Sequence, residues 1–151
     1  MTKIRFFCVL TALLLLTACQ QAPDGETPGP DGEGIELGVI NDEAEEVSIT
    51  QIIENPEEYH GKVVRVTGVG QLDMEGNILF LHKEDYDSSN VRNALWINLN
   101  EEIVDYDEAA KLNGKYVLVE GTFDMENSGG MGLYSGAVSG ITRYKLDSDK
   151  R

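Results

Sequence analysis

Residues 61–68 read GKVVRVTG, and this stretch decides the fold. Val64 and Val66 fall on one face of it and Arg65 and Thr67 on the other, which is the alternation of a half-buried strand. A similar pattern occurs again at residues 114–121, which read GKYVLVEG. The echo occurs only once, whereas repeat folds need about three or more units to bury a core. We therefore interpret the two stretches as similar strands of one barrel.

The rest of residues 47–146 divides into short apolar runs separated by turn residues. A short helix is expected before Asn55 and Pro56, which end it. A second helix is expected at 101–112, where acidic residues crowd the start and Lys111 lies near the end. A polar loop is expected at 85–90. The expected strands are 62–68, 78–82, 94–99, 114–121 and 133–144.

Three strands, a helix and two strands follow one another in this interpretation. That is the order of the OB-fold, a five-stranded Greek-key barrel with a helix between strands three and four. The sequence thus predicts an all-β domain of OB-like type with little helix. The barrel domain is expected at 47–146, followed by a tail at 147–151.

The first residues have the composition of a secretory signal. An apolar run extends from Ile4 to Leu16, with Lys3 and Arg5 at its start. This run is too short for a membrane span but long enough for the apolar part of a signal peptide. Leu16, Thr17, Ala18 and Cys19 resemble the bacterial lipobox. This resemblance implies that residues 1–18 are a signal peptide and that Cys19 carries the lipid. Gln20, which follows, is not the Asp that resembles an inner-membrane retention signal.

This targeting interpretation predicts a lipid-anchored protein of the cell envelope. In a two-membrane cell we expect it on the outer membrane, facing the periplasm, and otherwise on the outer face of the plasma membrane. Cys8 leaves with the signal peptide, so the mature chain contains only Cys19. A disulfide, a thiolate metal site and a cysteine nucleophile are therefore excluded.

The mature chain is strongly acidic. The sequence has 12 Lys and Arg and 27 Asp and Glu, and removal of Lys3 and Arg5 leaves 10 minus 27, or −17. Such a charge disfavours nucleic acid and anionic lipid headgroups as partners. Residues 20–46 hold three prolines, nine acidic residues and no Lys or Arg. The sequence predicts a disordered acidic linker at 19–46, behind the lipidated Cys19.

Residues 48–144 resemble a small family of largely uncharacterised bacterial envelope proteins with an OB-like domain. The resemblance lies in three groups of residues. They are Asn55, Pro56, Tyr59, Gly61, Lys62, Val64, Val66 and Gly68 at the first strand, Leu81, His82, Lys83, Glu84 and Asp85 after the second, and Gly132 through Gly136. It implies a fold and no particular mechanism, because OB-folds serve many unrelated functions.

The ligand site is expected on the face of strands two and three. OB-folds that bind nucleic acid place aromatic platforms and basic residues there. The candidates here are Phe80, His82, Lys83, Trp96 and Tyr134. Oligonucleotide binding remains an alternative, but acidic residues surround the few basic ones. Trp96 could equally be a partly buried packing residue.

Metal binding is a second alternative. His82 with the carboxylates that follow it would suit a divalent ion, although a solvated acidic loop explains them as well. Thioethers and imidazole suit Cu(I), and Met74, Met125 and Met131 could join His82 and Trp96 at the loop mouth. His60 is expected to be a turn residue.

Catalysis has little support in the sequence. Ser135 between Tyr134 and Gly136 lacks the spacing of a nucleophile elbow, and the chain has only two histidines. A hydrolytic enzyme is therefore the weakest alternative, and no cofactor is expected. We expect a non-enzymatic binding or assembly module whose acidic surface meets an envelope protein or a cationic peptide.

Overall fold

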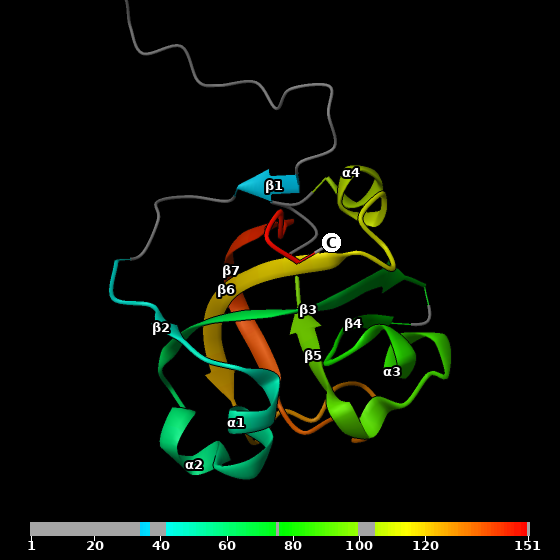
Figure 1. Cartoon of the computed structure of the whole chain (residues 1–151). Helices are drawn as coiled ribbons and strands as arrows, with labels where there is room; N and C mark the ends of the chain where they lie inside the picture. Colours follow the sequence, from blue (N-terminus) through cyan, green and yellow to red (C-terminus); the bar gives the residue numbers. More distant parts are fainter. Residues whose placement is uncertain (1–33, 37–41, 75, 100–104, 151) are drawn as a thin grey trace, which may run out of the picture.

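The computed structural model describes residues 34–36, 42–74, 76–99 and 105–150 (Figure 1). The predicted signal peptide, Cys19 and most of the predicted linker lie outside these residues. Within the described part, no helix is both long enough and apolar enough to cross a membrane.

Five strands form a closed ring. They are β3 Val63–Asp73, β4 Gly76–Phe80, β5 Ala94–Asn98, β6 Tyr116–Asp124 and β7 Ala137–Leu146. The ring runs β3, β4, β5, β7, β6 and back to β3, and all its pairs are antiparallel except β5 with β7. The prediction of a mostly β, barrel-like domain is confirmed. Its five strands fall close to the expected positions.

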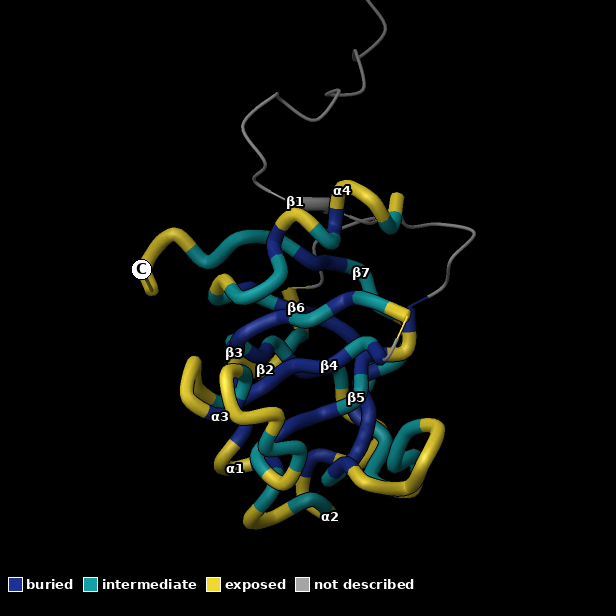
Figure 2. Tube along the Cα trace, turned by 90° about the vertical axis from the view of Figure 1, so that its right-hand side faces the viewer, coloured by how far each residue is buried: buried dark blue, intermediate teal, exposed yellow. Residues whose placement is uncertain are grey.

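The two echo stretches are neighbours in the ring. They pair antiparallel on β3 and β6, with Val66 directly opposite Val119. Both valines are fully buried, as are Val64 and Val117, so the predicted apolar face is the inner face of the ring. β3 continues to Asp73, beyond the predicted end at Gly68, and it bends from β6 to β4 along its length. Figure 2 shows the buried residues following the strands and the exposed ones the helices and loops.

Short helices lie before β3 and in the connections between β4, β5 and β6. They are α1 Ile49–Glu54, α2 Pro56–Tyr59, α3 Lys83–Asp87, the 3-10 helix Val91–Asn93 and α4 Tyr106–Ala110. α1 begins at a capping box between Ser48 and Gln51 and buries Ile49 and Ile52. α4 lies within the helix predicted at 101–112, of which residues 101–104 lie outside the described residues. It begins after its N-cap Asp105, whose carboxylate accepts the Glu108 N–H, and it ends at Ala110, two residues before the predicted end.

The loop predicted at 85–90 is wrong in its first residues, because α3 extends to Asp87. Asp85 is buried rather than solvated. Its carboxylate accepts hydrogen bonds from the side-chain amides of Asn90 at 2.7 Å and Asn93 at 3.0 Å. These hydrogen bonds hold the residues that follow α3 against the Asp85 carboxylate, so the helix ends there.

Two short strands lie within the segment predicted as a linker. β1, Gly34–Glu36, pairs antiparallel with β7, and β2, Glu45–Glu46, pairs parallel with β3. At these five residues the structure has strands where the sequence predicts a disordered linker. The physical reason is that these parts of β7 and β3 pair with β6 on one side and with no other ring strand on the other side, and an open strand edge attracts further backbone.

Candidate functional site

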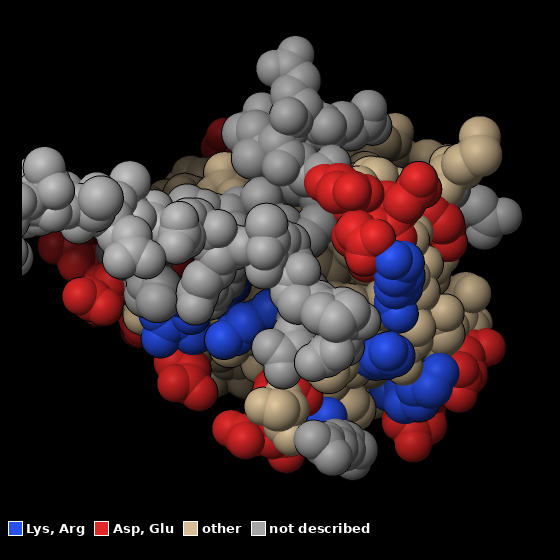
Figure 3. Space-filling model, turned by 90° about the horizontal axis from the view of Figure 1, so that it is seen from above, with Lys and Arg blue, Asp and Glu red and all other residues tan. Residues whose placement is uncertain are grey.

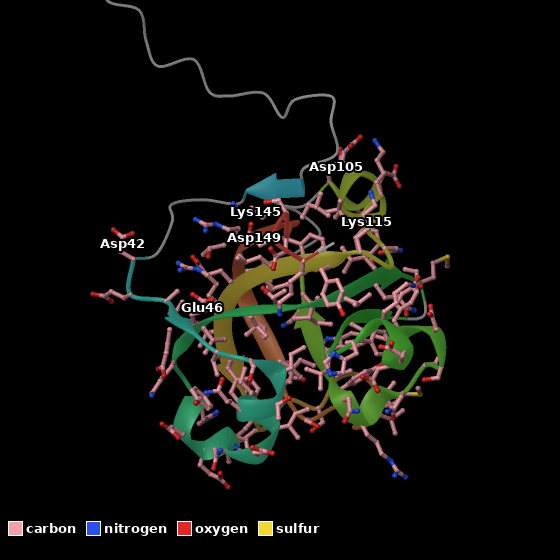
Figure 4. All side chains as sticks on the ribbon, viewed as in Figure 1. Asp42, Glu46, Asp105, Lys115, Lys145 and Asp149 are labelled. Atoms are coloured by element: carbon pink, nitrogen blue, oxygen red, sulfur yellow. The ribbon has the colours of Figure 1, made fainter. Side chains whose placement is uncertain are left out.

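A groove of about 970 Å³ lies on the outside of the ring. Its floor is the outer face of β3, β6 and β7, and its walls are β2 with the start of α1 on one side and the chain after β7 on the other. Figure 4 shows Glu46 at the first wall, Asp149 at the second, and Lys145 at the border of the floor, below β1. The floor consists of Arg65, Thr67, Tyr116, Leu118, Arg143 and Lys145.

One row of residues across the sheet beneath this groove alternates in charge. Arg65 on β3 lies opposite Glu120 on β6, and Glu120 lies opposite Arg143 on β7. The strand β2 extends the row at one end, since Glu46 lies opposite Arg65 in the register. Opposite charges that face each other across strands stabilise a sheet. The register therefore aligns four charged positions of alternating sign, on β2, β3, β6 and β7.

The centre of the row is buried. Glu120 has 0% exposure, and its Oε2 accepts from Arg65 Nε at 3.0 Å and Nη2 at 2.9 Å. Arg143 Nη1 lies 4.0 Å from the same oxygen, and Thr142 Oγ1 donates to Oε1 at 3.0 Å. Charges this far from water need such partners. The two guanidinium groups are thereby held in fixed positions at the groove floor.

The groove is lined by charged residues of both signs. Four of the nine described Lys and Arg residues line it, namely Arg65, Arg143, Lys145 and Lys150, together with Glu46, Asp147 and Asp149. Elsewhere Lys62 pairs with Glu45 at 3.2 Å and Lys83 with Asp87 at 2.8 Å. Seen from above, Lys and Arg form separate groups beside acidic side chains (Figure 3). The groove thus places basic and acidic side chains next to one another along its lining.

Phe80, Trp96 and Tyr134, predicted as ligand residues, come together in a second apolar cluster outside the ring. Phe80 is buried and meets Tyr86 of α3 edge to face at 5.8 Å. Trp96 is half-buried and packs at 5.3 Å from Tyr134, which lies in the β6–β7 connection. Burial raises the pKa of the Tyr134 phenol, and Asp73 adds to the rise. The outer face of β4 and β5 is therefore covered by the chain's own side chains.

His82 and Lys83, the remaining predicted ligand residues, lie at the start of α3. His82 is exposed and lines the groove near Leu81. The Lys83 ammonium stands 4.3 Å from the centre of the Tyr86 ring and pairs with Asp87. The structure thus divides the predicted set between the groove and the aromatic cluster.

The residues of the predicted copper site lie on separate elements. Met74 is fully exposed in the β3–β4 turn, and Met131 is exposed in the β6–β7 connection. Met125 packs against the main core. His82 lines the groove instead.

A different group brings potential metal ligands together. His60, Asp124 and Glu126 each have a ligand atom within 4.8 Å of the others. His60 Nδ1 lies 3.6 Å from Asp124 Oδ1 and accepts the Met125 N–H at 3.3 Å. That hydrogen bond gives His60 a role in joining the turn before β3 to the end of β6. His60 precedes β3 and Asp124 ends β6, so a predicted pairing of the two echo strands could have placed these residues together.

The sequence interpretation missed Glu120, Arg143 and Lys145. Alternation along the strands does place Arg65 and Glu120 on outer faces, but only the register brings opposite charges into one row. No protein-family model matches the chain, and a search of curated proteins finds no similar sequence. The groove and its charges are therefore the basis for assigning a function.

Proposed function

We propose that this protein is a lipid-anchored binding module of the bacterial envelope that takes an extended polypeptide segment in the groove. It acts without catalysis. Residues 1–18 are removed as a signal peptide, and Cys19 carries the lipid. In a two-membrane cell the protein lies on the outer membrane, facing the periplasm, and otherwise on the outer face of the plasma membrane.

The barrel is of OB type in this proposal. The order of the strands around the ring and the place of α4 between β5 and β6 support this assignment. The aromatic cluster occupies the face where OB-folds commonly bind ligands. The groove on β3, β6 and β7 is therefore the more accessible place for a partner.

One observation carries the proposal: β7 already accepts a strand along the border of the groove. Residues Arg143–Lys145 of β7 pair with β1, and Arg143 and Lys145 also line the groove. An open sheet edge beside side-chain pockets is a common way to recognise extended polypeptides. A mature charge of −17 and scattered basic groups favour a polypeptide over nucleic acid.

A pull-down from envelope extract tests the groove. We compare the mature chain with the double variant Lys145→Glu, Lys150→Glu and with the control Lys83→Glu, Lys111→Glu, which changes charge equally outside the groove. The proposal expects the control to retain the same proteins as the unchanged chain and the groove variant to lose them. Equal retention by all three chains would contradict it.

The anchor has its own test. Metabolic labelling with a radioactive fatty acid should mark the full chain, and Cys19→Ser should abolish the label and release the protein from the membrane fraction. A membrane-bound Cys19→Ser variant would refute the lipoprotein assignment.

A further inference from the structure

We propose that His60, Asp124 and Glu126 form a binding site for one zinc ion. The three side chains come from the turn before β3 and from the end of β6 and the residues after it, and each has a ligand atom within 4.8 Å of the others. None of the three lines the groove. The inference therefore goes beyond the proposed function and does not depend on it.

The backbone ladder between β3 and β6 continues past the start of β3 and holds these residues together. Gly61 N–H donates to the Phe123 carbonyl at 2.9 Å, and Phe123 N–H donates to the Lys62 carbonyl at 3.0 Å. The ladder keeps His60 beside the residues that follow Phe123 along the chain. The two segments that carry the ligand atoms are therefore fixed to each other by the fold itself, which is what a metal site requires of its supporting elements.

His60 presents the lone pair of Nδ1 to the site. Nδ1 accepts the Met125 N–H at 3.3 Å, so this nitrogen carries no proton. It lies 3.6 Å from Asp124 Oδ1, and two acceptors at this distance repel each other. A cation between them makes the contact attractive. The Met125 N–H is exposed, so water can accept its hydrogen bond when an ion takes the lone pair.

The spacing of the ligand atoms suits zinc. In tetrahedral sites zinc binds imidazole nitrogen at about 2.0–2.1 Å and carboxylate oxygen at about 2.0–2.2 Å, which puts two such ligands about 3.4 Å apart. The 3.6 Å between His60 Nδ1 and Asp124 Oδ1 is close to this value. Glu126 is exposed, so its side chain can rotate to complete the set. Water takes the fourth position, as in other zinc sites with three protein ligands.

The charge of the site also suits a divalent ion with some affinity for nitrogen. Two carboxylates and a neutral imidazole match the double charge of Zn²⁺, whereas Ca²⁺ and Mg²⁺ prefer sites made of oxygen alone. Asp124 Oδ1 accepts the Glu126 N–H at 2.9 Å, and this hydrogen bond orients the first carboxylate. Within the described ranges, no Lys or Arg forms an ion pair with either carboxylate, and the nearby Lys62 pairs with Glu45. The chain's own cations therefore do not compete for these ligands.

Zinc titration followed by isothermal calorimetry tests the site. The mature chain with Cys19→Ser contains no thiol and should bind one ion. In this background His60→Asn retains an acceptor for the Met125 N–H, and Glu126→Gln changes only an exposed carboxylate. Each change should weaken zinc binding at least about tenfold, because each removes a ligand. Excess Ca²⁺ should not displace the zinc.

The matched control removes the chain's other histidine and an exposed carboxylate beside it, as His82→Asn with Glu84→Gln. It should bind zinc as tightly as the unchanged background, whereas His60→Asn with Glu126→Gln should not bind. Loss of binding in the control, or binding that survives both changes at the proposed site, would overturn the inference. Displacement of zinc by Ca²⁺ would also overturn it, since it would show that the ion associates with the acidic surface in general.

Melting temperature gives a second readout. Zinc should raise it in the background chain and in the control, because an ion that binds only the folded chain stabilises that state. It should not raise it in the double variant at His60 and Glu126. Circular dichroism without zinc verifies that each chain is folded, and if His60→Asn were unfolded, Glu126→Gln alone would decide. An equal rise in every chain would refute the site, and the extract test of the groove would be unaffected.

Discussion

Arg65 and Glu120 lie opposite each other on β3 and β6, and both the Nε and the Nη2 of the arginine donate to one carboxylate oxygen of the glutamate. Glu120 is fully buried, and Arg65 keeps 24% of its side chain exposed at the groove. This pair joins the two echo strands on their outer faces while the valines join them inside. It therefore links the stability of the ring to the groove floor.

Glu120→Gln should lower the free energy of unfolding by about 3–5 kcal/mol, because it leaves two guanidinium groups without their buried counter-charge. Urea unfolding measures the loss. Glu45→Gln is the control, since its pair with Lys62 is about half exposed and should contribute less than about 1 kcal/mol. Similar losses in the two variants would show that the buried row does not stabilise the ring.

Gly68→Ala should destabilise the protein by roughly 1–3 kcal/mol, through overpacking. A Cβ at this position would lie 2.5 Å from the backbone oxygen of Phe80, which cannot move without disturbing β4. Gly130→Ala is the matched change, because a Cβ there has nothing within 4 Å. Thermal unfolding should separate the two variants clearly, and equal melting temperatures would contradict this packing.

Tyr144→Phe should raise the free energy of unfolding at neutral pH, by about 1 kcal/mol. Among the described residues, the buried Tyr144 hydroxyl has no hydrogen-bond partner, so its removal from water is not compensated. Its ring remains in the core in the variant. Urea unfolding at pH 7 gives the comparison, and a loss of more than about 1 kcal/mol would indicate a partner for this hydroxyl.

Alkaline pH should destabilise the unchanged chain more than Tyr144→Phe. Burial raises the pKa of the Tyr144 phenol well above its ordinary value of 10.0. The unfolded chain therefore loses this proton first as pH rises above about 10, and the folded chain retains it. Stability present below pH 10 is lost above it. Urea midpoints at pH 8 and pH 11 should fall further for the unchanged chain, and parallel declines would show that Tyr144 does not contribute.

The ring was predictable from the sequence because its strands alternate with a period of two. GKVVRVTG and GKYVLVEG indicated two similar strands, and the structure pairs them directly. The helix between the third and fourth strands also followed from local signals, namely the acidic residues near its start and Lys111 near its end. Local pattern was sufficient where a segment's own periodicity determines which face is buried.

The groove was not predictable in the same way. Arg65, Glu120 and Arg143 are far apart in the chain, and only the strand register brings them into one row. β1 has three residues and too little alternation to indicate a strand. Asp85 looked like part of a solvated loop because its partners, Asn90 and Asn93, act through side-chain hydrogen bonds that no periodicity reports.

The attachment of β1 to β7 also sets how far the domain would stand from the proposed lipid. With β1 paired, the linker predicted at residues 20–33 would separate the anchor from the barrel, and a coil of that length would span about 20 Å. Without the pairing of β1, the predicted linker would extend to β2 at Glu45, and a coil of that length would span about 25–30 Å. Three paired residues would thus shorten the proposed tether by up to about 10 Å, and the height of the domain above a bilayer would report whether they are paired.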